Sequence, residues 1–156
     1  GEEAVELVAE LLVEGLPELT NELLLPSYLV RLSEACASAG YAEGAAVVLP
    51  ALDRFEGPVA VLATGHLCYG AIDRVRGDLL RTLGRDDEAI AAYGRAMQTD
   101  AALGHAGLVA RSQLGIATTL FARGDKAEAA AIAGEAVATA ERLGFPAVAQ
   151  LARDLT

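Results

Sequence analysis

Gly84-Arg-Asp-Asp-Glu-Ala89 is the central copy of a short phrase that occurs three times in this chain. In each copy a glycine precedes four mostly polar residues and an alanine that opens an apolar run. The other copies are Gly40-Tyr-Ala-Glu-Gly-Ala45 and Gly124-Asp-Lys-Ala-Glu-Ala129, at spacings of 44 and 40 residues. A repeat of this length between helical stretches indicates stacked helix-turn-helix units, which need their neighbours to bury their apolar faces. Such proteins usually bind other molecules rather than catalyse reactions.

The composition favours one all-α domain. The chain has 156 residues, of which 53% are hydrophobic, enough for a substantial core and typical of a single domain. Much of this apolar content is alanine and leucine, which are strong helix formers, whereas aromatic residues make up only 4%. Alanine also permits the close helix approach that a stacked array requires.

The net charge of −10 is concentrated near the N-terminus. Residues 1–60 carry eleven acids and two bases, residues 61–111 carry six of each, and residues 112–156 carry five acids and four bases. A chain with this balance lacks the basic cluster that would match a phosphate backbone, so we expect no direct nucleic-acid binding. The acidic N-terminal part has two interpretations, a solvated helix face or an acidic docking surface.

No feature of the sequence indicates a membrane or secreted protein. There is no apolar run of about 18 residues and no basic segment followed by an apolar core and a cleavage site. The two cysteines, Cys36 and Cys68, fit a reduced cytoplasmic protein better than a disulfide framework. Because the chain starts at Gly1 and enters a helical pattern at once, we expect a fragment of a longer protein.

The apolar periodicity predicts about eight helices, arranged as antiparallel pairs with short loops. They are expected over residues 2–15, 27–39, 42–55, 67–83, 86–103, 106–123, 126–143 and 146–154. Gly40 is expected to end its helix in a left-handed conformation. Pro50 is expected to kink the following helix or to shift its start. Residues 56–65 are expected to be a connector without helix, because they contain glycines and Pro58. Their apolar middle part is expected to pack against the protein.

The central copy resembles a tetratricopeptide repeat. The small residue, turn glycine, alanine, aromatic residue and second alanine of that family fall on Gly77, Gly84, Ala89, Tyr93 and Ala96. The sequence departs from the family where Asp73, Arg76 and Ala101 stand in place of a tryptophan, a leucine and a proline.

The flanking copies resemble the family less closely. The first keeps Leu32 and Ala45, and the third keeps Ala129 and Ala136 beside the turn glycine Gly124. The resemblance implies a single domain, residues 1–156, folded as a right-handed superhelical array of antiparallel helix pairs. Its repeats are expected roughly at 26–56, 67–103 and 106–143, with flanking helices at 2–15 and 146–154.

Repeats of 40 to 44 residues, rich in alanine, leucine and arginine, are similar to the C-terminal helical region of large bacterial ATP-dependent regulators. These include LuxR-type transcription activators and related cyclase-type proteins. The stretches that carry the resemblance are Leu16-Pro17, Leu32-Ser-Glu-Ala-Cys-Ala37, Cys68-Tyr-Gly70, Gly77-Asp-Leu-Leu80 and Leu83-Gly-Arg-Asp-Asp-Glu-Ala89. The resemblance implies a segment that senses a ligand or a protein partner and transmits its state to an ATPase module. The alternative is a scaffold that assembles partner proteins without sensing a small molecule.

No strong catalytic motif is present, and we expect neither enzymatic activity nor a cofactor. The sequence lacks a phosphate-binding loop, a nucleophile elbow, a His-Glu-x2-His motif and a Cys-x2-Cys motif. His66 and Cys68 are two residues apart, so on a helix their side chains would diverge and share a metal poorly. We therefore expect no metal site.

The candidate binding surface is implied by the tetratricopeptide resemblance, in which the first helix of each unit lines a concave groove. The implied groove residues are Val30, Glu34, Arg74, Asp78, Arg81, Arg111, Leu114, Thr118 and Phe121. Three arginines on one face can hold a carboxylate or phosphate, with Phe121 as an apolar wall. We expect a small anionic effector, or a protein or peptide partner, to bind there. In the alternative interpretation, Arg74 and Arg81 only pair with Asp78 along a solvated helix.

The apolar face of residues 2–13 also has two interpretations. As the edge helix of the array it packs against the rest of the chain. Alternatively it pairs with a second copy in a homodimer, because terminal units of a repeat array normally need a polar cap.

Overall fold

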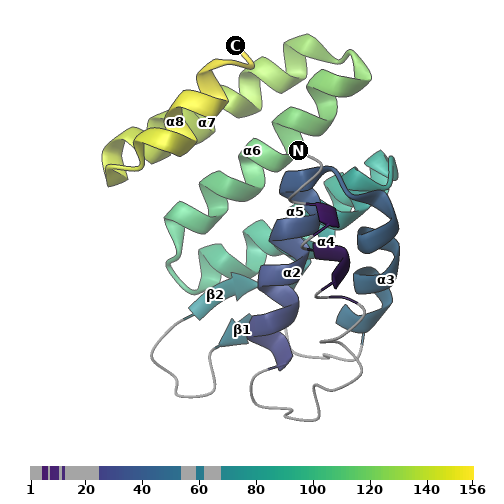
Figure 1. The fold of residues 1–156 in the computed structure, drawn as a ribbon. Coiled ribbons are helices and arrows are strands. Elements are labelled where there is room, and N and C mark those ends of the chain that lie inside the picture. The colour runs from purple at the N-terminus through teal and green to yellow at the C-terminus, as the bar shows by residue number, and fades with distance from the viewer. Residues whose placement is uncertain (1–4, 7, 11, 13–24, 54–58, 62–67) are drawn as a thin grey trace.

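The computed structural model of the chain is built almost entirely of helices, which confirms the all-α prediction (Figure 1). It describes residues 5–6, 8–10, 12, 25–53, 59–61 and 68–156. The elements with defined bounds are α2 (Leu25–Ala39), α3 (Ala42–Leu52), β1 (Val59–Val61), β2 (Cys68–Ala71), α4 (Ile72–Thr82), α5 (Asp86–Ala102), α6 (Ala106–Arg123), α7 (Lys126–Leu143) and α8 (Pro146–Arg153). The described residues between 5 and 12 are helical as well, and the other residues of the expected helix 2–15 lie outside the described part.

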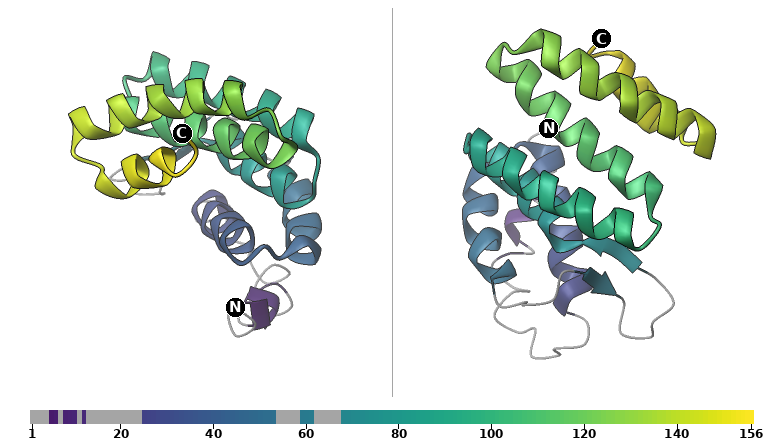
Figure 2. Two further views of the ribbon diagram at one scale, coloured as in Figure 1. Left: turned by 90° about the horizontal axis from the view of Figure 1, so that it is seen from above. Right: turned by 180° about the vertical axis from the view of Figure 1, so that it is seen from behind.

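The helices form two layers. Helices α2, α4, α6 and α8 pack successively against one another, while α3, α5 and α7 each pack against the helix before and the helix after. Figure 2 shows that this array follows a curved path from α2 to α8. The α2–α4–α6–α8 layer therefore holds the first helix of each expected unit, which is where the sequence places the groove. The right-handed superhelical twist stays a prediction.

Five glycines end the helices in the same way. Gly40, Gly84, Gly104, Gly124 and Gly144 have φ angles between +65° and +98°, the left-handed region that glycine adopts without strain. The N–H group after each glycine donates to the carbonyl oxygen five residues earlier, at 2.8–2.9 Å. Each turn therefore satisfies carbonyl groups that the helix end leaves open, and the expected left-handed cap at Gly40 is confirmed.

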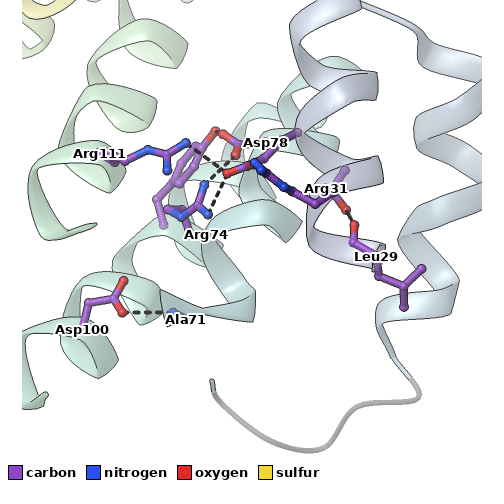
Figure 3. A network of polar contacts seen from close by, with 10 residues as sticks. Leu29, Arg31, Ala71, Arg74, Asp78, Asp100 and Arg111 are labelled. Carbon is purple, nitrogen blue, oxygen red and sulfur yellow. Dashed lines mark hydrogen bonds and ion pairs between the residues drawn. The ribbon is translucent and has the colours of Figure 1, made fainter. Parts of the chain in front are cut away.

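The expected helix over 67–83 begins too early. Residues 68–71 form β2, which pairs antiparallel with β1, and α4 starts only at Ile72. Gly70 has a φ of +83°, which cannot continue into a right-handed helix. The N–H group of Ala71 donates to Oδ1 of buried Asp100 in α5 at 2.9 Å (Figure 3). The hairpin escaped prediction because this bond joins residues 29 positions apart.

The other expected helices agree with the structure apart from small shifts at their ends. Helices α6 and α7 have the predicted bounds, and α2, α5 and α8 differ by one or two residues. The helix expected over 42–55 ends at Leu52. Pro50 lies inside its last turn, so it neither starts nor divides the helix.

The N-terminal helix contributes to the core. Val8 is 6% exposed and Leu12 is 9% exposed, and both belong to the apolar cluster that includes Leu29 of α2 and Leu79 of α4. This packing agrees with the interpretation of an edge helix. A homodimer through this helix stays a prediction.

The small and aromatic repeat residues are buried between helices. Ala45, Ala89, Ala96, Ala129 and Ala136 are all 0% exposed. Tyr93 in α5 is also 0% exposed, and its ring lies between two glycines of neighbouring helices. A Cβ atom on Gly77 of α4 would lie 2.7 Å from its ring carbon Cδ1, and one on Gly115 of α6 would lie 2.5 Å from Cζ. The ring therefore fills the space that the two missing side chains leave.

Replacing Gly77 with alanine should destabilise the protein by about 1–3 kcal/mol, because the added methyl group meets a ring that Gly115 prevents from moving away. Urea unfolding followed by circular dichroism measures this change. Gly134→Ala in α7 is the control, since a Cβ atom there has no heavy atom within 4 Å. It should stabilise the protein by about 0.5–1 kcal/mol through helix propensity. A Gly77→Ala variant as stable as Gly134→Ala would contradict the close packing.

Candidate binding groove

A groove of about 540 Å³ lies along the layer formed by α4, α6 and α8. Its polar residues are Arg74, Asp78, Arg81, Arg111, Thr118 and Asp154. Its larger apolar residues are Leu114, Val148, Leu151 and Leu155. Arg74, Asp78 and Arg81 of α4 stand three or four positions apart, and so do Arg111, Leu114 and Thr118 of α6. Each helix therefore turns one face toward the groove.

Glu34 of α2 joins three arginines from three helices. Its Oε1 accepts hydrogen bonds from Nη2 of Arg74 and from Nη2 of Arg111, each at 3.1 Å. Its Oε2 lies 3.6 Å from Nη1 of Arg31 on the same helix. Figure 3 shows Arg31, Arg74 and Arg111 converging from α2, α4 and α6. These contacts hold the first layer of helices together at the groove.

Arg74 is the buried cation of this network. Its side chain is 3% exposed, and Nη1 also pairs with Oδ2 of Asp78 at 3.4 Å. Oδ1 of Asp78 accepts a hydrogen bond of 2.7 Å from the hydroxyl of Tyr93. The clamped Tyr93 ring thus orients Asp78, which in turn positions Arg74.

Burial and the neighbouring positive charges have opposite effects on the pKa values of Glu34 and Asp78. Burial raises the pKa of Glu34, but Arg74 and Arg111 outweigh it and hold that pKa below its ordinary value. Burial raises the pKa of Asp78 above its ordinary value, although Arg74 and Tyr93 partly oppose it. Burial and the Asp78 carboxylate raise the pKa of the Tyr93 hydroxyl, which therefore acts as a donor.

Two guanidinium groups in the groove remain able to bind an incoming group. Among the described residues, Arg81 forms no ion pair and its buried Nε has no hydrogen-bond partner. Its guanidinium group nevertheless interacts with the Tyr93 hydroxyl, and its charge opposes the rise in the pKa of Asp78. Arg111 is paired with Glu34, but its side chain is 45% exposed. At the groove and its network, Arg31, Arg74, Arg81 and Arg111 stand against Glu34, Asp78 and Asp154, so guanidinium groups outnumber carboxylates by one.

The structure gathers most of the predicted groove residues at one place. Those that line the groove are Arg74, Asp78, Arg81, Arg111, Leu114 and Thr118, and Glu34 bonds to two of them. Val30 does not contribute, because it is 2% exposed and packs in the core. Phe121 lies outside the groove lining, and Nζ of Lys126 stands 5.6 Å from its ring centre.

The apolar wall comes instead from Val148 and Leu151 of α8 and from Leu155, which follows this helix. The tetratricopeptide resemblance implies groove residues only in the three repeats and none in the flanking helix at 146–154. The apolar spacing of residues 148, 151 and 155 was the available signal, because α8 continues the layer of α2, α4 and α6.

The alternative of simple pairing along a solvated helix holds only in part. Arg74 does pair with Asp78 four positions later, but it is buried and also reaches Glu34 on another helix. Arg81 acts on Asp78 through its charge, which opposes the rise in the pKa of Asp78, without a direct ion pair between these two described residues. The arginines are therefore arranged between helices rather than along one of them.

The remaining candidates for chemistry lie apart from the groove. Cys36 is buried, Cys68 is exposed, and both are free thiols. His66 lies outside the described residues. Within the described ranges, no group of three histidine, cysteine or acidic residues is arranged to hold a metal ion.

Comparisons with protein families, with curated proteins and with solved structures found no significant match to this chain. None of the helices in the described ranges combines the length and the apolar character needed to cross a bilayer.

Replacing Glu34 with glutamine should lower the stability at neutral pH by about 1.5–3 kcal/mol, the range for hydrogen bonds to charged groups. Because the pKa of Glu34 is lowered in the folded state, its stabilisation is present above its ordinary pKa of 4.5. It is lost as the pH falls through the folded-state pKa. Urea unfolding of both proteins from pH 7 to pH 3 should show the difference shrinking at acidic pH. The exposed Glu43→Gln substitution is the control, and an equal, pH-independent loss in both variants would contradict the network.

Proposed function

We propose that this chain is a non-catalytic recognition module whose groove binds an acidic segment of a protein partner. The observation that carries the proposal is the pair of guanidinium groups that Arg81 and Arg111 present in the groove. In a chain with a net charge of −10, a local excess of cations is an unusual feature. Guanidinium groups match the planar geometry of carboxylates, so acidic side chains are suitable occupants.

The shape of the groove supports a peptide rather than a compact ion. The groove runs along α6 from Arg111 to Thr118 and is bounded by α8, where Leu151 is 57% exposed. An extended segment can place acidic groups against the arginines and its own apolar groups against Leu151. The two kinds of contact together are typical of peptide recognition, in which charge guides the encounter and apolar burial adds affinity.

The polar groups of the groove are arranged for binding. The Thr118 hydroxyl donates to the carbonyl oxygen of Leu114 at 2.8 Å, and Asp78 already accepts from Tyr93. Both groups are thus engaged within the fold, whereas the arginines still offer donors. A role within a cytoplasmic bacterial regulator, as a module that senses a partner, is part of this proposal and rests on the sequence resemblance alone.

The proposal is tested by selecting binders from a displayed library of random decapeptides on the whole chain. We expect the selected peptides to be enriched in aspartate and glutamate. For a synthetic selected peptide, fluorescence polarisation should show at least tenfold weaker binding by Arg81→Gln and by Arg111→Gln, because each lost charge-assisted bond contributes about 1.5–3 kcal/mol.

Arg142→Gln is the matched control, because Arg142 is exposed on α7, outside the groove lining, and the substitution removes the same charge. Its affinity should equal that of the unaltered protein. Circular dichroism confirms that each variant folds. The proposal would be overturned if all three variants bound the peptide with equal affinity, or if the selected peptides showed no acidic enrichment. Binding of free phosphate or citrate alone would favour a small anionic effector instead.

A further inference from the structure

A second pocket of about 520 Å³ adjoins the groove at the N-terminal end of α6. It lies between the α5–α6 turn and the α7–α8 turn. Its larger apolar walls are Leu108, Leu143, Phe145 and Val148. Arg111 and Val148 line both this pocket and the groove, so the two hollows are adjacent at these residues.

Two glycines hold the walls of the pocket in place. A Cβ atom on Gly107 would lie 2.5 Å from Cε2 of Phe145, so the ring packs directly on the first turn of α6. A Cβ atom on Gly70 would lie 2.3 Å from Cδ1 of Leu108, which therefore rests on the backbone of β2. The ring of Phe145 nevertheless remains partly open, because that residue is 46% exposed. Both apolar walls therefore rest against backbone, and walls already in position lower the ordering cost of binding.

We propose that this pocket is the specificity pocket for one large apolar side chain, leucine or an aromatic residue, of the acidic segment that occupies the groove. The inference rests on the proposed function. Its support is the adjacency of the two hollows, the mainly apolar walls of the second one, and the charge of Arg111 where they meet. Pockets of several hundred cubic ångströms with apolar walls and few polar groups are typical of ligand sites.

The length of α6 along the pocket and the groove limits the spacing between the apolar residue and the acidic residue of the partner. Gly107 and Thr118 are 11 positions apart in α6, which corresponds to ~16 Å along the helix axis. An extended peptide covers that distance with about five residues. The apolar residue of the partner therefore stands within about five positions of its acidic residue. A segment with an acid alone fills only half of the site.

The experiment uses two synthetic versions of a decapeptide selected on the whole chain. One carries its enriched apolar residue, and in the other that residue is alanine. We expect the alanine version to bind at least tenfold more weakly, as measured by fluorescence polarisation. In the Ala106→Trp variant, where the new ring fills the pocket, both versions should bind with the same weak affinity. The Phe145→Ala variant lacks one wall of the pocket. In this variant too, the difference in affinity between the two peptides should be smaller than in the unaltered protein.

Ala131→Trp is the matched control, because Ala131 is exposed on α7 and lines neither hollow. It should retain the full difference between the two peptides. If acidic peptides bind but the apolar residue makes no difference in any protein, the pocket assignment is overturned and the proposed function stands. If Ala106→Trp preserves the difference while folding normally, the assignment is overturned as well. If no acidic peptide is selected at all, the proposed function fails first.

Discussion

The packing of Tyr93 between Gly77 and Gly115 is the constraint on which the rest of the structure depends. This one ring contacts α4 and α6 from its place in α5, and it can do so only because both neighbours lack a side chain. Its hydroxyl then donates to Asp78, the carboxylate that pairs with buried Arg74. The packing of the Tyr93 ring between helices therefore orients the Asp78 carboxylate at the groove. Interiors transmit such constraints because they are close-packed.

The charged network extends this constraint across the inner layer. Glu34 receives hydrogen bonds from Arg74 of α4 and Arg111 of α6, so three helices of the layer meet at one carboxylate. A buried ion pair is not by itself a strong source of stability, because desolvation offsets much of the attraction. Its effect here is positional. Arg74 is buried and paired with carboxylates of the fold, whereas Arg81 and Arg111 face the groove.

Much of the groove could be predicted from the sequence because helical spacing is a local property. Once the turn glycine Gly84 defined the register of its helix pair, the tetratricopeptide resemblance assigned Arg74, Asp78 and Arg81 to the groove face of α4. The same reasoning placed Arg111, Leu114 and Thr118 on α6, and the structure finds all six in one groove. Val30 and Phe121 were expected in the groove but lie outside its lining, because the space beside each residue depends on neighbouring helices. Val30 is covered by the core, and α8 takes the place expected for Phe121.

The sequence by itself determined the all-α class, the turn positions and most helix bounds, since these depend on glycine at left-handed caps and on apolar spacing within each helix. Only the tertiary structure decided three other matters. Residues 68–71 are a strand because they pair with β1, and the bond from Ala71 to Asp100 ties this strand to a distant helix. Helix α8 forms the apolar wall because it continues the inner layer. Arg81 is left to bind while Arg74 is buried, because only the packed helices show which guanidinium group lies within reach of Glu34.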